Sequence, residues 1–201
     1  MAVEPRRRHL VIFARRPQYG VGKRRLAREI GDLAALRFAR RALSALRRRL
    51  ADGRRWTSWI AGSPDRPLDW AGAGCGLPQG GGDLGARMGR VLAQLPPGPV
   101  VIIGADTPGV GQRDVVAAFR ALGAADAVFG PAADGGYWLI GLRRPAAHPD
   151  IFRDVRWSSP DTLADTMRNL KGRRVAMLAI REDVDDAGAL ARLQTGDFRP
   201  W

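Results

Sequence analysis

Several polar residues follow directly after short apolar runs, where buried strands are expected to end. Asp106 stands just after the apolar run 100–103, with a Gly-Ala pair between them. A carboxylate at the end of a buried strand is costly to desolvate unless it is paired or binds a metal. Asp106 is therefore a candidate for catalysis and for binding a divalent cation. The alternative is a structural role in a turn or at a helix N-terminus.

A basic loop follows the first apolar run, 10–14. Its cationic side chains are those of Arg15, Arg16, Lys23, Arg24 and Arg25. Glycines in the loop allow the backbone to approach a phosphate closely, and the amides at the start of the next helix favour an anion. The loop is thus a candidate phosphate-binding site. The alternative is an exposed basic loop without a ligand.

Two further carboxylates follow the last predicted strand. Asp183 and Asp185 are two residues apart, so both side chains can point in one direction and share a hard cation through oxygen ligands. A plain acidic turn explains the same residues equally simply. The pair is therefore a second candidate metal site.

Three common motifs do not fit the sequence. The segment 20–24 is similar to a phosphate-binding P-loop, but Pro17 stands where its first Gly belongs and Arg24 where its Ser or Thr belongs. The glycines at 80, 82 and 85 have the spacing of a dinucleotide fingerprint, yet they do not follow a strand. A Ser-His-Asp nucleophile would have to use His9 or His148, and neither lies beside an elbow-like turn.

The composition of the chain indicates which partners and which cellular compartment to expect. Among 201 residues, 33 Lys and Arg stand against 20 Asp and Glu, a formal net charge of +13. Such an excess favours polyanionic partners, phosphorylated small molecules included. One cysteine, Cys75, and two histidines exclude an intrachain disulfide and a structural zinc site. The apolar run after the basic N-terminus is too short for a signal peptide or a membrane span, so we expect a cytoplasmic protein.

Strands and helices alternate along the chain. Strands are expected at 10–14, 56–61, 100–103, 127–130, 137–142 and 175–180, and helices at 23–30, about 36–50, 83–95, 112–122, after 161 and at 186–193. This alternation predicts right-handed crossovers and a mainly parallel sheet covered on both faces. We expect 10–14 and 100–103 to be adjacent central strands, and 137–142 to depart from parallel pairing.

Local signals set some of these bounds. Apolar residues that recur every three or four positions predict one buried helix face, at Leu36, Ala39, Leu43, Leu46 and Leu50. Asp83 is expected to cap one helix, and Ser158 with Asp161 to form a capping box before another. The stretch 62–82, rich in Gly and Pro, is either functional or contains an unrecognised strand.

Six blocks of the sequence together resemble one family. In chain order they are 13–17 with 20–27 (FARRP, GVGKRRLA), 79–88 (QGGGDLGARM), 103–108 (IGADTP), 130–142 (GPAADGGYWLIGL), 157–160 (WSSP) and 183–185 (DVD). They resemble the bacterial glycosyltransferase-A-like transferases of arsenosugar biosynthesis, also described as radical-SAM/selenodomain-associated transferases. The phospholactate guanylyltransferases are more distantly similar. The first loop of the family usually reads Val-Lys-Thr-Arg, where this chain has Gly-Lys-Arg-Arg at 22–25.

This resemblance implies a nucleotide-diphospho-sugar transferase (GT-A) fold, a three-layer α/β architecture with a mainly parallel mixed sheet, in one domain over residues 1–201. It implies Mg²⁺ or Mn²⁺ as cofactor, with Asp106, Asp183 and Asp185 as the metal ligands. The first loop would bind the nucleotide phosphates, and the segment 79–85 would lie near the base or the ribose. The nucleotide-binding residues implied in this way are Phe13, Arg15, Lys23, Arg25, Gln79, Asp83 and Gly85.

The Asp-Gly-Gly-Tyr block implies an acceptor site. Asp134 would orient or deprotonate the acceptor, with Tyr137 and Trp157 as an aromatic wall. The substrate-binding residues expected here are Gly135, Gly136, Tyr137, Trp157 and Ser158. The structural alternatives are a turn for Asp134, a place in the strand core for Tyr137 and loop packing for Trp157.

Three functions compete for this sequence. The favoured one is a metal-dependent glycosyltransferase, with Asp106 and Asp134 as catalytic residues, that moves a sugar from a nucleotide sugar to a small polar metabolite. The second is a nucleotidyltransferase that releases pyrophosphate from a nucleoside triphosphate. The third, a nucleic-acid-binding protein, is disfavoured because the additional carboxylates repel a polyanion. We therefore expect neither a nucleic-acid nor a membrane partner.

Overall fold

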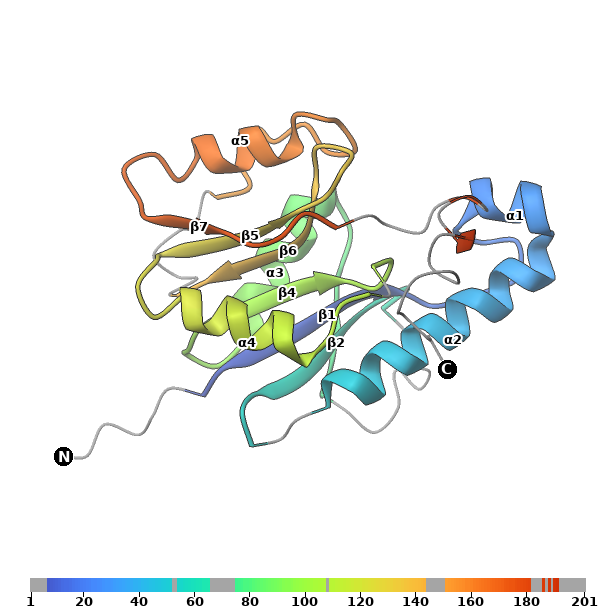
Figure 1. The fold of residues 1–201 in the computed structure, drawn as a ribbon, viewed down its shortest axis with the longest axis horizontal. Coiled ribbons are helices and arrows are strands. Elements are labelled where there is room, and N and C mark those ends of the chain that lie inside the picture. The colour runs from blue at the N-terminus through green and yellow to red at the C-terminus, as the bar shows by residue number, and fades with distance from the viewer. Residues whose placement is uncertain are drawn as a thin grey trace.

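The computed structural model describes residues 7–51, 54–65, 75–107, 109–143 and 151–181, together with 186, 188, 190 and 191. Within these residues a seven-stranded sheet has the order β3-β2-β1-β4-β6-β5-β7 (Figure 1). The strands are β1 (His9–Arg15), β2 (Thr57–Ser63), β3 (Cys75–Pro78), β4 (Val100–Gly104), β5 (Ala127–Pro131), β6 (Tyr137–Leu142) and β7 (Val175–Met177).

The two most apolar strands lie side by side in the middle of the sheet, as predicted. β1 pairs in parallel with β2 on one side and with β4 on the other, where Ile12 is opposite Ile103. β6 runs antiparallel to both β4 and β5, which confirms its predicted departure from parallel pairing. Because β1, β2, β4 and β5 point the same way, their C-terminal residues meet at one edge of the sheet, here named the carboxyl edge. Ligands of open α/β sheets bind at such an edge.

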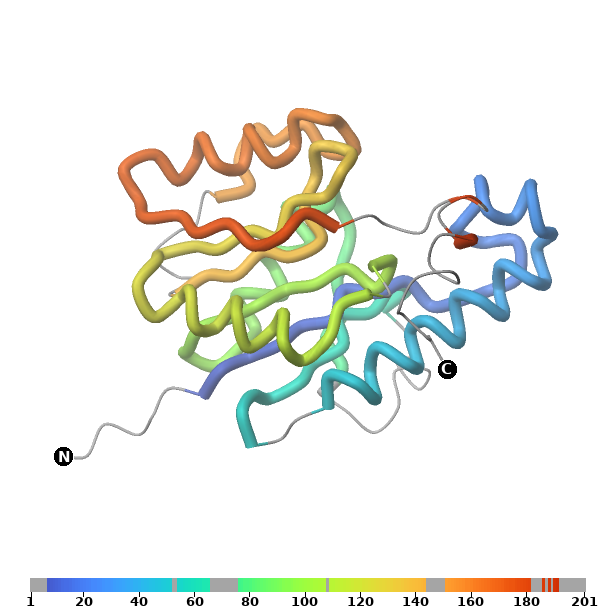
Figure 2. Tube along the Cα trace, viewed as in Figure 1, coloured from blue at the N-terminus to red at the C-terminus, as the bar shows by residue number. Residues whose placement is uncertain are grey.

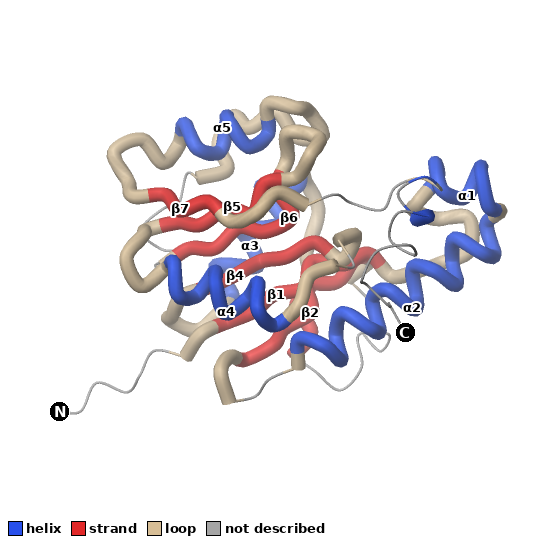
Figure 3. The backbone as a smooth tube through the Cα atoms, in the orientation of Figure 1, coloured by secondary structure: helices blue, strands red, loops and turns tan. Residues whose placement is uncertain are grey.

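Helices cover both faces of the sheet (Figures 1 and 3). They are α1 (Arg24–Ile30), α2 (Asp32–Leu50), α3 (Leu84–Gln94), α4 (Gln112–Ala121) and α5 (Thr162–Arg168). α2 and α4 pack on one face, where Leu46 and Phe119 share a core with Ile12 of β1. α3 and α5 pack on the other, where Val91 and Leu163 belong to a second core. The three-layer α/β fold is therefore confirmed.

α1 and the first half of α2 project beyond the carboxyl edge (Figure 2). A third, smaller core holds them together, with Leu26 of α1 against Ala35 and Phe38 of α2. The predicted apolar face of α2 is wrong in this half, because Leu36 and Ala39 are only half-buried. In this half α2 packs against α1 and not against the sheet. The buried positions are therefore Ala35 and Phe38, each one residue before a predicted position.

The stretch 62–82 contains β3, which pairs in parallel with β2, so the alternative of an unrecognised strand is confirmed. Two predicted element signals need correction. β7 ends at Met177, three residues before the predicted end of that strand. The capping box of Ser158 and Asp161 does not form, because Ser158 has a left-handed backbone (φ 55°) and Asp161 makes no capping hydrogen bond from its side chain.

The remaining helix predictions are close to the observed bounds. Asp83 caps α3, and its carboxylate accepts a hydrogen bond of 2.8 Å from the Ala86 N–H. Of the expected helix 186–193, only four residues are described, and the Leu190 N–H donates to the Asp186 carbonyl at 3.1 Å. Among the described residues, no helix has the length and hydropathy needed to cross a bilayer.

Candidate functional site

A pocket of about 280 Å³ lies at the carboxyl ends of β1 and β4, between the loop that follows β1 and the helix α2. Its charged lining comes from Arg15, Arg16, Lys23 and Asp106. Its apolar lining comes from Phe13 at the end of β1 and from α2, namely Phe38, Ala39, Ala42 and Leu43. We call this the Lys23 pocket. Three cations and one carboxylate beside an apolar wall suit a ligand that has both an anionic group and a flat or apolar part.

Lys23 and Asp106 face each other across the pocket. The Lys23 Nζ lies 3.0 Å from Asp106 Oδ1, and the Lys23 side chain is 11% exposed whereas that of Asp106 is 61% exposed. Lys23 precedes α1 and has a left-handed backbone, with φ 45° and ψ 39°. Gly20 and Gly22 also have positive φ, and together they form the tight turn that directs Lys23 back toward β4. The loop after β1 and the end of β4 are thus joined by one ion pair.

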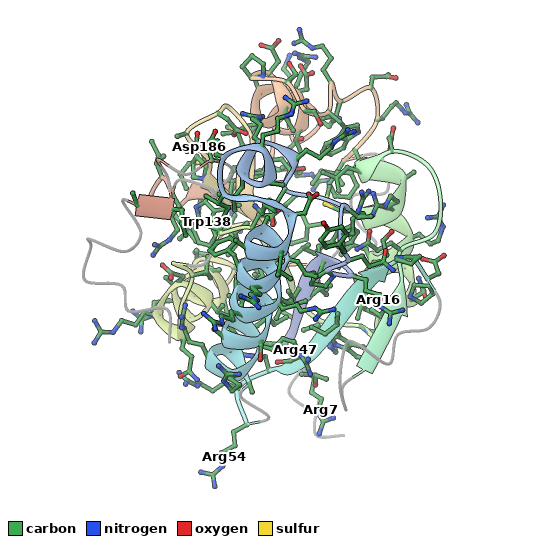
Figure 4. The ribbon with its side chains drawn as sticks, turned by 90° about the vertical axis from the view of Figure 1, so that its right-hand side faces the viewer. Arg7, Arg16, Arg47, Arg54, Trp138 and Asp186 are labelled. Atoms are coloured by element: carbon green, nitrogen blue, oxygen red, sulfur yellow. The ribbon has the colours of Figure 1, made fainter. Side chains whose placement is uncertain are left out.

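Figure 4 views the carboxyl edge with α1 and α2 in front. Arg16 is labelled to one side of α2 in this view and Trp138 to the other. Of the predicted phosphate-binding residues, Phe13, Arg15 and Lys23 line the pocket. Arg25 does not line it and is exposed on the first turn of α1. The structure therefore brings three of these four residues together.

The Gln79 side chain is part of the interior and does not face the pocket. It is 1% exposed, and its Nε2 donates to the carbonyls of Ala14 (3.0 Å) and Ala61 (2.7 Å). Its Oε1 accepts a hydrogen bond from Arg87 Nη2. Both amide hydrogens are used to hold the ends of β1 and β2, so the structure gives this side chain a structural role, and its predicted contact with a nucleotide stays a prediction.

Gly85 also has a packing role. A Cβ atom at this position would lie 2.6 Å from the Trp157 ring and 2.8 Å from Phe152 Cβ. The missing side chain allows the loop before α5 to pack against the first turn of α3. The structure thus gives Gly85 a packing role, and its predicted nucleotide contact stays a prediction. Asp83 has its carboxylate in the cap of α3.

Arg87 is a residue that the sequence reasoning did not single out. It lies in the first turns of α3, with its guanidinium 5.8 Å from the centre of the Phe13 ring. Its Nε is buried and has no hydrogen-bond acceptor among the described residues. Burial lowers the pKa of the Arg87 guanidinium, and the nearby charge of Arg15 lowers it further. The signal in the sequence is its place in the block 79–88, which also contains Gln79, Asp83 and Gly85.

The turn between β5 and β6 places Asp134 at the carboxyl edge. The Asp134 carboxylate is exposed and accepts a 2.9 Å hydrogen bond from the Gly136 N–H. Gly135 has φ 87°, and a Cβ atom there would lie 2.1 Å from the Pro160 carbonyl oxygen. The Gly135 carbonyl accepts from the Leu163 N–H at 3.0 Å. The turn is thus fixed against the start of α5.

The two aromatic residues expected to line an acceptor site pack inward. The Tyr137 ring meets the edge of Phe129 with 5.3 Å between centroids, and burial raises the pKa of its hydroxyl. The Trp157 ring lies 6.0 Å from Phe152, and its Nε1 is buried. Both residues are half-buried and have these packing roles, and their predicted contact with an acceptor stays a prediction. Ser158, beside Trp157, is exposed.

An ion-pair cluster holds the loop that carries Trp157 and Ser158. The Asp165 carboxylate is almost fully buried and accepts from Arg156 Nε (2.8 Å), Arg156 Nη2 (2.9 Å) and Arg168 Nη2 (2.6 Å). The hydrogen bonds from Arg156, above all, hold the pKa of Asp165 well below its ordinary value. The loop is therefore anchored to α5 by charge-assisted hydrogen bonds.

The predicted metal ligands Asp183 and Asp185 lie outside the described residues. Arg181, two residues before Asp183, forms a bridge with Ala132 after β5, and its Nη2 pairs with Asp114 Oδ1 at 2.6 Å. The chain thus reaches the carboxyl edge just before these carboxylates. In the described part of the chain, no three His, Cys, Asp or Glu side chains are grouped to hold a metal. His9 lies at the opposite edge, where burial lowers its pKa.

Comparisons with known proteins agree with this architecture. The family described as "Uncharacterized protein conserved in bacteria (DUF2064)" matches residues 39–159. A protein of Desulfovibrio desulfuricans G20 that bears the provisional name nucleotide-diphospho-sugar transferase has a similar crystal structure. It is 28% identical, with 96% of this chain and 90% of that chain covered and a TM-score of 0.85. Curated protein sequences give no significant match.

Two more distant structures have the same fold. The first is 4-diphosphocytidyl-2C-methyl-D-erythritol synthase of Anaerococcus prevotii DSM 20548, 11% identical, covering 94% of this chain and 99% of that chain, with a TM-score of 0.62. The second is glucosyl-3-phosphoglycerate synthase of Mycobacterium tuberculosis in complex with Mn²⁺, UDP and glucosyl-3-phosphoglycerate. It is 14% identical, covering 93% and 76%, with a TM-score of 0.51. The chain therefore has the fold of the nucleotide-diphospho-sugar transferases, and its structural neighbours are transferases.

Proposed function

The chain belongs to the DUF2064 family, and we propose that it is a nucleotide-utilising transferase that moves a sugar from a nucleotide sugar to a small polar metabolite. The observation that carries the proposal is the Lys23 pocket, where cations from the loop after β1 meet a carboxylate from the end of β4. The fold shared with the Desulfovibrio protein supports the same class of reaction. The more specific resemblance to arsenosugar-biosynthesis glycosyltransferases supplies the glycosyl part of the proposal.

The pocket has the charges that the departure of a nucleoside diphosphate requires. When the bond from the sugar carbon to the diphosphate oxygen breaks, negative charge grows on the leaving group. Lys23, 11% exposed, and the half-buried Arg16 can stabilise this charge with little reorganisation, because Lys23 is held by Asp106 and the Arg16 N–H donates to the Ser63 carbonyl at 2.7 Å. In this proposal the apolar lining from α2 contacts the uncharged part of the donor.

The described residues fit a divalent cation only in part. Asp106 offers one exposed carboxylate, and the cation now beside it is the Lys23 ammonium. A Mg²⁺ site often uses one or two carboxylates together with substrate phosphates, so a single described ligand is compatible with a metal that binds with the nucleotide. We propose Asp106 as a metal ligand, with Asp183 and Asp185 as further ligands. A bound cation would add positive charge at the leaving diphosphate.

The acceptor is proposed to bind at the turn between β5 and β6. Asp134 is exposed there, and within the described residues one of its oxygens accepts the Gly136 N–H hydrogen bond, which leaves the other to orient or deprotonate a hydroxyl. Gly135 and Gly136 leave the turn without side chains beside this carboxylate. The exposed Ser158 lies on the neighbouring loop before α5.

Nucleotidyl transfer remains the second candidate function. Arg15, Arg16 and Lys23 line the pocket, and Arg87 interacts electrostatically with Arg15, so four cations lie near the end of β1. This charge also suits a triphosphate. In this reaction the acceptor would attack the α-phosphorus, and pyrophosphate would leave.

Product analysis separates the two functions. The protein is incubated with Mg²⁺ or Mn²⁺, a panel of nucleotide sugars and nucleoside triphosphates, and a small-metabolite extract as the source of acceptors. We expect release of a nucleoside diphosphate from a nucleotide sugar, slowed about a hundredfold in Lys23→Met and Asp106→Asn. The exposed Arg28→Met, on the last turn of α1, is the matched control and should react like the wild type. Pyrophosphate release without sugar turnover would establish the second function, and the absence of both products would reject the proposal.

A further inference from the structure

A further cation, Arg87 of α3, lies next to two residues of the Lys23 pocket, Phe13 and Arg15. Side chains of β1 alternate between the two faces of the sheet, and Phe13 belongs to the core on the α3 side. Arg87 of α3 lies over the Phe13 ring, at 5.8 Å. Arg15, two residues after Phe13, is exposed at the end of the strand and interacts electrostatically with Arg87. Arg15 and Arg87 therefore lie near each other at the carboxyl edge.

The orientation of the Arg87 guanidinium is fixed by Gln79. Because the Gln79 Nε2 donates to the carbonyls of Ala14 and Ala61, its Oε1 is directed away from both strands. That oxygen accepts the hydrogen bond from Arg87 Nη2. A buried amide with no freedom to rotate thus holds one side of the guanidinium. This arrangement positions the arginine but leaves its charge uncompensated.

The charges around Arg87 are predominantly positive. The positive charges of Arg15 and Arg90 repel the Arg87 guanidinium, and the negative charge of Asp65 attracts it. The Asp65 carboxylate already accepts a hydrogen bond of 3.0 Å from the Gly80 N–H. Within the described part of the chain, the buried Arg87 Nε has no acceptor. A half-buried guanidinium in such surroundings is stabilised by an anion, and a phosphoryl group accepts several hydrogen bonds from guanidinium groups.

We infer that Arg87, together with Arg15 of the Lys23 pocket, forms an anion-binding subsite that extends this pocket toward α3 and binds a phosphoryl group of the substrates. The inference rests on the proposed function, since it assigns the phosphoryl group to a transferase substrate. Two sources have this chemistry: the diphosphate of the nucleotide itself and a phosphoryl group on the acceptor. Gln79 acts here as a positioning residue, because it reaches the ligand only through Arg87.

Calorimetric titration with UDP, GDP and inorganic phosphate tests the subsite. The variants are Arg87→Met, the more conservative Arg87→Lys, and Arg37→Met as a matched control on the exposed face of α2. If the subsite holds the nucleotide diphosphate, UDP or GDP binds about tenfold more weakly to Arg87→Met, and phosphate does not bind to the nucleotide-saturated wild type. If it holds the acceptor, phosphate binds to the nucleotide-saturated wild type and about tenfold more weakly to Arg87→Met.

Different results would reject the subsite and the proposed function, so the two claims are tested separately. Equal binding of nucleotide and of phosphate to Arg87→Met and Arg37→Met would overturn the subsite. Arg87→Lys keeps the charge but loses the planar set of donors, so it should lose several-fold in affinity even if Arg87→Met does not fold. If no nucleotide binds to the wild type, the proposed function fails. Phosphate titrated into the nucleotide-free protein then tests the subsite alone, with loss expected in Arg87→Met but not in Lys23→Met.

Discussion

At the scale of single residues, the candidate site contains a lysine with a left-handed backbone conformation. Lys23 has φ 45°, in the left-handed region that residues with a Cβ atom seldom adopt. Such strain persists only where surrounding contacts compensate for it, and it is frequent at binding sites. Here the compensating contact is the 3.0 Å ion pair with Asp106, which is also the pair of groups proposed to act on the substrate.

Gly135 and Gly136 permit a prediction that distinguishes a glycine required by close backbone packing from a neighbouring glycine that is not. A Cβ atom on Gly135 would meet the Pro160 backbone at 2.1 Å, whereas one on Gly136 would meet only the Asp134 carboxylate, at 3.2 Å. We expect Gly135→Ala to lower the free energy of unfolding by about 2–4 kcal/mol, because the turn between β5 and β6 must move away from α5. Gly136→Ala should lower it by about 1 kcal/mol or less. Urea denaturation measures both values, and equal losses would contradict this account.

At the scale of elements, two sets of buried polar contacts hold the loops of the carboxyl edge. Gln79 joins the ends of β1 and β2 to the first turns of α3. Asp165 of α5 joins the 156–161 loop to its own helix through Arg156. The positions of Arg87 and Ser158 therefore depend on buried polar contacts, which hold them more firmly than solvent-exposed pairs would.

Asp165 makes stability depend on pH in a defined direction. Its pKa in the folded protein is depressed, so its ion pairs stabilise the protein above the ordinary pKa of an aspartate, about 3.9, and this contribution is lost as the pH falls further. We expect Asp165→Asn to lower the melting temperature by several degrees at pH 7, with a difference from the wild type that shrinks below about pH 4. The control is Asp161→Asn, which removes the exposed partner of Arg156 and should change the melting temperature little. A difference that is the same at pH 7 and pH 3 would show that the charge of Asp165 has no such role.

At the scale of the whole molecule, the sequence predicts the sheet better than the site. The runs in β1 and β4 are apolar at every position because both faces are covered, and this pattern is visible without coordinates. The central position of these strands followed from it. The expectation of one domain over 1–201 stays a prediction.

The parts that sequence reasoning missed depend on contacts between distant segments. Gln79 has the residue type of a ligand-binding side chain, but only the fold shows that its amide faces Ala14 and Ala61. The sequence around Gly85 suggests a glycine that gives a ligand room to bind, whereas in the structure its missing side chain gives Trp157 and Phe152 room to pack. Both packing roles are invisible in the sequence for one reason, since a sequence does not tell whether a polar residue or a glycine after a strand faces a ligand or the core.

The central claim is that the Lys23 pocket binds the phosphates of a nucleotide. The most direct measurement is calorimetric titration of nucleoside diphosphates and the matching nucleosides into the wild type, Lys23→Met and the control Arg28→Met, with Mn²⁺ present. The account predicts that Lys23→Met weakens binding of the diphosphate about tenfold or more and leaves the weaker binding of the nucleoside unchanged, because only the charge-assisted contact to phosphate is removed. Arg28→Met should change neither affinity. An equal loss for diphosphate and nucleoside, or no loss for the diphosphate, would contradict the claim.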